Sequence, residues 1–157
     1  MKVLGLTGSI GMGKSTAASM LRRLGVPVHD SDAAVHRLMA RGGAAVPAIA
    51  NAFPDVVHDG VVDRSALGGI VFADRAALAR LEAIVHPLVS REAERFLARH
   101  RRRRTPLVVL DVPLLLEANG HRRCDLVAVV SAPRAVQRQR VMARPGMTES
   151  RLKAILA

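Results

Sequence analysis

A phosphate-binding pattern near the N-terminus, Gly-x-x-x-x-Gly-Lys-Ser at residues 8–15, constrains this chain more than any other feature. The pattern is typical of a loop that holds nucleotide phosphates between a buried strand and a helix. Its glycines let the backbone approach an anion closely, so that amide groups point at β- and γ-phosphate oxygens. Lys14 supplies a positive charge for these phosphates and Ser15 a hydroxyl for Mg²⁺. The pattern therefore predicts a nucleotide-dependent enzyme.

The residues on both sides of the pattern fit this interpretation. Residues 1–7 form a short apolar run suited to a buried parallel strand, and residues 16–24 carry apolar side chains at helical spacing until Gly25. A glycine-rich turn without a ligand is the alternative, but it does not explain the flanking strand and helix. We expect the phosphates of the nucleotide to be bound by the central residues of the pattern, Gly11, Met12, Gly13, Lys14, Ser15 and Thr16.

The rest of the chain alternates between strand and helix patterns. Further strands are predicted at residues 26–30, 107–111 and 125–130, and helices at residues 32–41, 134–142 and 149–156. The middle is more helical up to about residue 100, with turns near Pro54 and Asp59-Gly60. This alternation predicts an α/β fold in which helices flank a parallel sheet, with ligands at the carboxyl ends of the strands.

Composition limits the class of protein. The 157 residues suit one domain, and no apolar run approaches the length of about 18 residues that suggests a membrane span. The N-terminus lacks the layout of a secretory signal, so we expect a cytoplasmic protein with no membrane partner. The only cysteine, Cys124, allows no internal disulfide and is expected to be a packing residue.

The net charge of +11, from 24 basic and 13 acidic residues, favours anionic ligands but does not choose between nucleotides and nucleic acid. The dense basic cluster at residues 100–104 is expected to be a solvated connector between a helix and a strand. Single-stranded nucleic-acid binders usually add aromatic stacking platforms, whereas this chain has three Phe and no Trp or Tyr. A basic RNA-binding module is therefore a secondary hypothesis, and no nucleic-acid partner is expected.

Three acidic residues stand at the ends of predicted strands: Asp30, Asp32 and Asp111. Asp111 ends an apolar run and is expected to hold Mg²⁺, in preference to a role as a helix cap, because no helix begins directly after it. A kinase also needs a carboxylate that orients the acceptor hydroxyl and takes its proton. Either Asp30 or Asp32 suits this role, but Asp32 is also a natural N-cap for the helix that follows. The residues alone leave both roles open.

The chain resembles the dephospho-CoA kinases over nearly its whole length. The matching blocks occur in the same order, at residues 8–16, 26–32, 60–67, 70–72, 81–89 and 111–117. The most specific of them are Asp-Arg-x-x-Leu, Leu-Glu-x-Ile-x-His-Pro and Pro-Leu-Leu-x-Glu. The resemblance implies a P-loop NTPase fold with a parallel core, a helical substrate-binding region and a lid.

The activity that this resemblance implies is ATP-dependent phosphorylation of the ribose 3′-hydroxyl of dephospho-coenzyme A, the last step of coenzyme A synthesis, with Mg²⁺. By this likeness Asp32, Lys14 and Arg140 become the catalytic candidates, and Arg140 and Arg144 the lid arginines that close over ATP. The candidates for the acceptor pocket are Asp30, Asp32, His86, Pro87, Leu115 and Glu117. For His86 the alternative is that it ends a helix, because a residue before proline avoids helical geometry. For Leu115 the alternative is ordinary core.

The resemblance also implies a domain organisation. A single kinase domain is expected over residues 1–157, with its core at 1–40 and 105–132, the substrate-binding region at about 42–100 and a lid from about 134. Members of the family continue beyond the last residue here, so we expect the lid to be incomplete. We also expect the chain as written to have weak or no activity, and the strand at residues 125–130 to be an exposed edge prone to association. Oligomeric state is not predicted.

Other functions stay open at this point. Another small-molecule kinase with the same loop, acting on a nucleoside or a sugar, is the main alternative among enzymes. A regulatory GTPase is disfavoured because the sequence contains no Asn-Lys-x-Asp segment for guanine recognition.

Overall fold

The computed structural model describes residues 1–113, 115 and 120–156, and the chain divides into two units. The first unit consists of Met1–His29 and Arg104–Ala157, and the second of Asp30–Arg103. Each unit is described by itself. This division does not test the predicted single kinase domain over residues 1–157, which stays a prediction.

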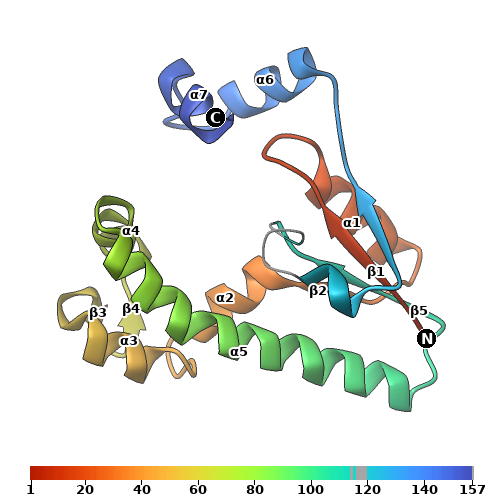
Figure 1. Ribbon diagram of the computed structural model, residues 1–157, viewed down its shortest axis with the longest axis horizontal. Coiled ribbons are helices and arrows are strands. Elements are labelled where there is room, and N and C mark those ends of the chain that lie inside the picture. Colours follow the sequence, from red (N-terminus) through yellow and green to blue (C-terminus); the bar gives the residue numbers. More distant parts are fainter. Residues whose placement is uncertain (114, 116–119, 157) are drawn as a thin grey trace. The chain divides into compact units, whose positions relative to one another are not determined.

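The first unit is built on a four-stranded sheet in the order β2-β5-β1-β6 (Figure 1). The strands are β1 (Lys2–Thr7), β2 (Val28–Asp30), β5 (Leu107–Asp111) and β6 (Leu126–Val129). β1 pairs in parallel with β5 and with β6, in a register that sets Leu6 opposite Asp111. The predicted α/β fold with a parallel sheet is therefore confirmed.

The helices of the first unit are α1 (Lys14–Arg23), the 3₁₀ helix η2 (Gly120–Arg123), α6 (Arg134–Met142) and α7 (Glu149–Leu156). The apolar spacing of α1 buries Ala18 in a cluster with Leu6 of β1 and Val109 of β5. This packing fixes α1 on the sheet. It also fixes the loop between β1 and α1, because both ends of that loop are anchored in the core.

β6 lies at one edge of the described sheet. Its side chains at Leu126 and Val129 are 65% and 62% exposed. The predicted exposure of this strand is confirmed. Its tendency to associate stays a prediction.

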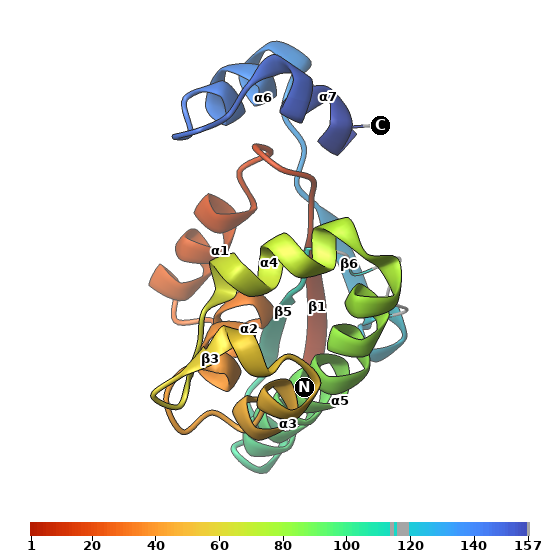
Figure 2. The ribbon, with the colours of Figure 1, turned by 90° about the vertical axis from the view of Figure 1, so that its left-hand side faces the viewer.

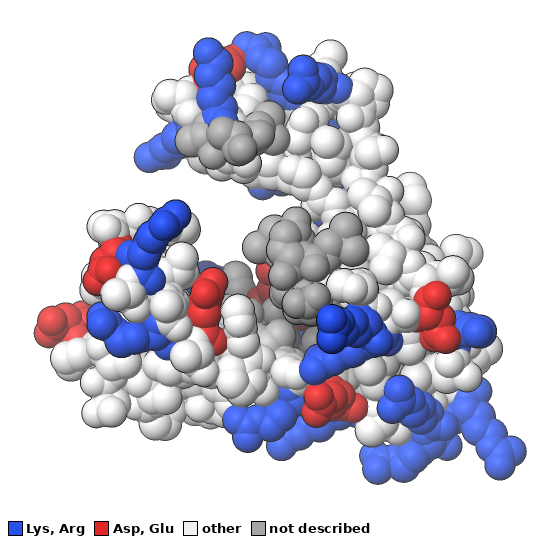
Figure 3. Space-filling view, viewed as in Figure 1, with Lys and Arg blue, Asp and Glu red and all other residues white. Residues whose placement is uncertain are grey.

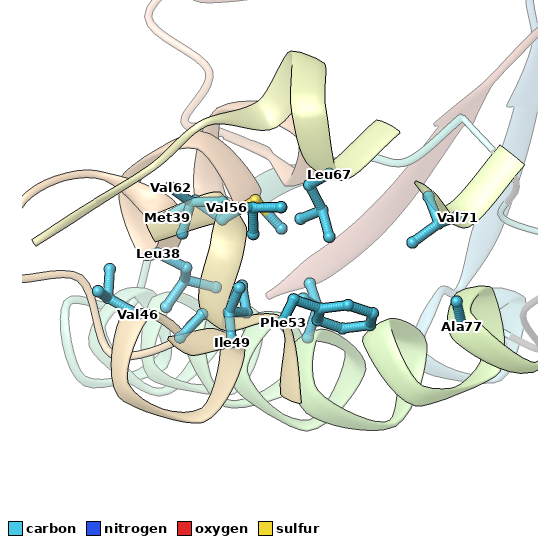
Figure 4. Close-up of a cluster of buried hydrophobic side chains, with 12 residues drawn as sticks. Leu38, Met39, Val46, Ile49, Phe53, Val56, Val62, Leu67, Val71 and Ala77 are labelled. Carbon is cyan, nitrogen blue, oxygen red and sulfur yellow. The ribbon is translucent and has the colours of Figure 1, made fainter. Parts of the chain in front are cut away.

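The second unit is mostly helical (Figure 2). Its elements are α2 (Ser31–Met39), α3 (Val46–Ala52), the 3₁₀ helix η1 (Pro54–Val56), β3 (Val57–His58), β4 (Val61–Val62), α4 (Arg64–Ala73) and α5 (Arg75–Arg102). Helices α2, α3 and α4 all pack against α5. The buried side chains between them include Leu38, Ile49, Phe53 and Leu67 (Figure 4).

α5 continues through Pro87, so the interpretation of His86 as the end of a helix is wrong. A proline inside a helix removes one backbone hydrogen bond and costs about 3 kcal/mol. Apolar side chains on both sides of Pro87, among them Val85 and Leu88, pack into the same core. Their burial offsets the cost of the proline, and the helix is not broken.

The turn predicted at Asp59-Gly60 belongs to a hairpin that we did not expect. Both residues have positive φ, 50° and 73°, and they connect the antiparallel strands β3 and β4. A two-residue Asp-Gly loop with positive φ at both positions is a favoured hairpin turn. The sequence signal was present, but strands of two residues are too short to show a pattern.

In the part of the chain that the structure describes, no helix is long and apolar enough to cross a membrane.

Candidate functional site

The loop between β1 and α1 curls over the start of α1. Gly11 and Gly13 have φ of 75° and 97°, a left-handed conformation that strains residues with a side chain. The Met12 amide donates to the Ser9 carbonyl at 3.3 Å, and Gly13 is the N-cap of the helix. The glycines of the sequence pattern are therefore required by the backbone path.

The N-terminus of α1 is suited to bind an anion. Among the described residues, no side chain caps this helix and its first turn contains no acidic residue. The first amide groups of a helix have no partner within the helix, and they carry the positive end of the helix dipole. Lys14, Ser15 and Thr16 form this first turn, so the loop and the helix present backbone donors to one place.

Lys14 and Asp111 form an ion pair in the first unit. The Lys14 Nζ lies 2.7 Å from the Asp111 Oδ1, and the two side chains are 15% and 4% exposed. Asp111 is the last residue of β5, and Leu6, one residue before the end of β1, lies opposite it. The parallel register thus brings the predicted metal ligand to the predicted phosphate-binding lysine.

The donor set here suits a metal ion that arrives with phosphates. Within the described ranges, no three His, Cys, Asp or Glu side chains form a group that could hold a metal. Mg²⁺ in nucleotide sites commonly takes one or two carboxylates, and phosphate and water oxygens complete its shell. The Asp111 carboxylate and the exposed Ser15 hydroxyl fit that requirement.

A pocket of about 460 Å³ lies in the first unit beside the loop between β1 and α1, residues 8–13, which we call the phosphate loop after its predicted role. Its lining comes from the loop, α1, the segment before α6 and α6 itself, and includes Met12, Gly13, Thr16, Met20, Pro133 and Arg140. The Arg140 Nη1 donates to the Gly11 carbonyl at 3.3 Å. The predicted lid arginine Arg140 is therefore placed at the loop. Arg144 is exposed in the segment after α6 and is not part of this lining.

Two contacts between the loop after β1 and residues 132–137 were not found from the sequence. The Met12 Sδ accepts a hydrogen bond from the Ala132 amide at 3.1 Å, and the Gln137 Nε2 donates to the Ile10 carbonyl at 2.9 Å. Both join residues that are more than a hundred positions apart. No sequence pattern within this single chain signals them.

Asp30 and Asp32 differ in their local roles. The Asp30 Oδ1 accepts from the Ala33 amide at 2.9 Å, which makes Asp30 the N-cap of α2. The cap role that we considered for Asp32 is therefore wrong, because the helix begins at Ser31. Asp32 lies exposed in the first turn of α2. Because its side chain is exposed to solvent, the Asp32 carboxylate is accessible to a ligand.

Arg64 and His36 form a contact that sequence reasoning missed. The Arg64 Nη1 lies 2.9 Å from the His36 Nδ1, and both side chains are exposed. His36 follows Asp32 by four residues on α2, so the two share one face of the helix. Arg64 stands in the Asp-Arg-x-x-Leu block at the start of α4, after its cap Asp63. The sequence block could have drawn attention to Arg64.

The remaining acceptor-pocket candidates lie in different elements. His86 and Pro87 are exposed in the middle of α5. Leu115 is fully buried in the first unit, where its Cδ2 would lie 2.5 Å from a Cβ placed on Gly5. That packing is what the core alternative for Leu115 predicts. Glu117 lies outside the described residues.

On the face shown in Figure 3, Lys and Arg side chains gather along the lower right, with a few Asp and Glu side chains among them. The basic cluster at residues 101–104 is exposed at the end of α5, as expected for a solvated connector. Burial and the positive charges of Arg103 and Arg99 lower the pKa of the neighbouring His100.

The chain is similar to known dephospho-CoA kinases throughout. A family model described as dephospho-CoA kinase matches residues 2–157. The dephospho-CoA kinase of Paramagnetospirillum magneticum is 74% identical over the whole chain, which covers 74% of that relative. The dephospho-CoA kinase of Mesorhizobium japonicum is 62% identical over the whole chain, which covers 79% of it.

Two solved structures have a similar fold. The crystal structure of TT1252 from Thermus thermophilus superposes with a TM-score of 0.84 at 40% identity, over 99% of this chain and 78% of that one. The dephospho-CoA kinase from Campylobacter jejuni superposes with a TM-score of 0.70 at 23% identity, over 98% of this chain and 78% of that one. At that identity the second likeness bears on the fold alone.

Proposed function

Because the chain belongs to the dephospho-CoA kinase family, we propose that it transfers a phosphoryl group from ATP to the ribose 3′-hydroxyl of dephospho-coenzyme A. This reaction is the last step of coenzyme A synthesis. The single structural observation that carries the proposal is the Lys14–Asp111 pair beside a glycine-rich loop and an uncapped helix start. The proposed location of the protein is the cytoplasm.

The donor nucleotide binds to the loop and to the start of α1. Backbone amides of Gly11, Met12, Gly13 and the first turn of α1 donate to phosphate oxygens, and the Lys14 ammonium group neutralises part of the charge. The ion pair with Asp111 supports this role, because it holds the Lys14 side chain close to the loop before the nucleotide arrives. A positioned lysine loses less side-chain entropy on binding.

Asp111 and Ser15 would hold Mg²⁺ that arrives with the nucleotide. When bound, the metal neutralises negative charge on the phosphates. The carboxylate of the buried residue Asp111 and the Ser15 hydroxyl at the helix start are the protein ligands in this proposal.

Asp32 orients the acceptor hydroxyl and accepts its proton as the new bond to phosphorus forms. This assignment is favoured because Asp30 already has a structural role as the cap of α2, whereas Asp32 is exposed on the first turn. Asp30, His86, Pro87, Leu115 and Glu117 stay candidates for shaping the acceptor pocket. Among them, the full burial of Leu115 favours packing over direct contact.

Arg140 and Arg144 act at the lid. A guanidinium group keeps its charge and can bind two phosphate oxygens at once, which suits it to stabilise charge that shifts during transfer. The contact between Arg140 and the Gly11 carbonyl supports its placement near the phosphates.

A substrate panel tests the proposal. The full-length protein is incubated with MgATP and either dephospho-coenzyme A, nucleosides or sugars, and products are identified by mass spectrometry with mapping of the phosphate position. We expect 3′-phosphorylated product from dephospho-coenzyme A only. Phosphorylation of another hydroxyl substrate, with none of dephospho-coenzyme A, would assign the chain to another small-molecule kinase reaction.

A further inference from the structure

Gln137 is one of two buried residues on α6, and the other is the apolar Val141. Gln137 is 4% exposed, whereas its neighbours Arg138 and Gln139 on α6 are exposed. A buried amide is costly unless its hydrogen bonds are made. Its Nε2 donates to the Ile10 carbonyl of the phosphate loop at 2.9 Å. The helix therefore buries a polar group against the loop, beside the apolar Val141.

Two further side chains on the same face of α6 contact the next loop residue. Arg140 and Val141 follow Gln137 by three and four positions, so the three side chains share one face. The Arg140 Nη1 donates to the Gly11 carbonyl at 3.3 Å. The Val141 Cγ2 would lie 2.6 Å from a Cβ placed on Gly11, so this glycine is needed for the close approach of the helix.

The bond from Gln137 limits the orientation of one peptide group. In a trans peptide the carbonyl of one residue and the amide of the next point in opposite directions. When the Ile10 carbonyl is held toward Gln137, the Gly11 amide is held away from α6. Glycine-rich backbone has many alternative conformations, so a peptide fixed before binding reduces the entropy that the loop loses when it binds phosphate.

We propose that Gln137 is a positioning residue that prepares the phosphate loop for ATP by holding the Ile10–Gly11 peptide in one orientation. The inference rests on the proposed function, since it assigns the loop to ATP. It adds that the affinity for ATP depends on the neutral side-chain amide of Gln137 on α6. This contribution is separate from the positive charge of the lid arginines. Gln137 does not touch substrate in this role.

The test compares Gln137→Met and Gln137→Glu with the matched controls Gln139→Met and Gln139→Glu in the full-length protein. Methionine keeps the volume but removes the donor, and glutamate keeps the shape but replaces the donor with a charged acceptor. We expect the Kd and KM for ATP to rise about tenfold in both Gln137 variants, since a lost buried hydrogen bond is worth about 1.4 kcal/mol. The KM for dephospho-coenzyme A should change less than twofold, and both Gln139 variants should match the unchanged protein.

A second measurement uses no nucleotide. Amide hydrogen exchange at residues 9–13 should become faster in Gln137→Met, while exchange in strand β1 stays the same. If both Gln137 variants fold, bind ATP as tightly as the unchanged protein and show unchanged exchange in the loop, the inference is overturned. If one of the two Gln137 variants fails to fold, ATP binding and loop exchange in the other variant test the inference.

These outcomes separate the inference from the proposed function. Failure of the unchanged protein to bind ATP would remove the proposed function, whereas normal ATP binding with insensitive Gln137 variants would remove only the role of Gln137. Equal rises in the KM for both substrates would indicate a general structural defect and would also overturn the inference.

Discussion

The Lys14 ammonium group donates to the Asp111 carboxylate at 2.7 Å, which joins the first residue of α1 to the last residue of β5. The two residues are 97 positions apart in the sequence. The parallel pairing of β1 with β5 brings them together, and the pair is largely shielded from solvent. Two groups proposed to act on phosphate and metal are thus positioned by one sheet register.

Removal of one partner of this pair should destabilise the protein. Lys14→Met leaves the Asp111 carboxylate buried without its ammonium partner, and breaking a buried pair costs about 3–5 kcal/mol, less where water has some access. The double variant Lys14→Met with Asp111→Asn should regain much of this loss. Urea denaturation of both single variants and the double variant measures the coupling. Additive losses in the double variant would show that the two side chains are energetically independent.

All three of these variants should lose at least about 100-fold in kcat/KM for ATP, including the double variant with recovered stability. The double variant is the control, because it should recover stability without recovering activity. A stable double variant with normal activity would remove both residues from the proposed catalytic machinery.

Asp32→Asn should lower kcat by about 100-fold or more, because amides are poor proton acceptors in general base catalysis. The Kd for ATP should stay within about twofold, since Asp32 is assigned to the acceptor. Turnover with dephospho-coenzyme A and calorimetric titration with ATP measure the two effects. Asp55→Asn, at an exposed carboxylate in the same unit, is the matched control. Unchanged turnover of Asp32→Asn would exclude Asp32 as the base.

Asp30 should respond to substitution as a helix cap. Asp30→Ala removes the acceptor for the Ala33 amide and should cost about 1 kcal/mol of stability. Asp30→Asn keeps an acceptor of similar capping strength and should cost much less. Thermal unfolding of the two variants provides the comparison. Equal losses would show that the charge of Asp30, rather than the cap, stabilises α2.

Protonation of Asp63, the N-cap of α4, should destabilise the folded protein at low pH. Hydrogen bonds from the backbone amides of Ala66 and Ser65 hold the pKa of the Asp63 carboxyl below its usual range. A carboxyl whose pKa is lower in the folded state stabilises the fold above its unfolded pKa of about 4, and this contribution disappears as pH falls through the folded value.

Thermal unfolding between pH 7 and pH 2.5 checks this expectation. The melting temperature of the unchanged protein should fall more steeply below about pH 4 than that of Asp63→Asn, whose capping amide does not titrate. Parallel pH profiles for the two proteins would contradict the assignment. Val3 donates in the same way to Asp125 and lowers its pKa, so Asp125→Asn offers an independent comparison.

Local physics made much of this protein predictable from its sequence. The phosphate loop depends on glycines at fixed spacing, and the helices at residues 134–142 and 149–156 were predicted with the bounds that the structure shows. The third predicted strand, residues 107–111, also has its observed bounds. In each case the signal lies in the order of neighbouring residues, because periodicity and turn chemistry act over a few positions.

Helix boundaries that depend on packing were less predictable. The cap of α2 is Asp30 and not Asp32, a shift of two residues that the order of Asp, Ser and Asp does not reveal. Pro87 suggested the end of a helix, but α5 continues through it because both halves of the helix bury apolar side chains in one core. Burial is a sum over many distant contacts, so it can override a local preference.

The sequence alone determined the kind of fold and the position of the glycine-rich loop between β1 and α1, since these follow from patterns within short segments. Only the tertiary structure decided that Lys14 meets Asp111 and that Gln137 meets the Ile10 carbonyl. These contacts join segments 97 and 127 residues apart, and their geometry depends on strand register and helix packing. No periodic pattern in one chain encodes which distant side chains meet, because that follows from how the elements pack together.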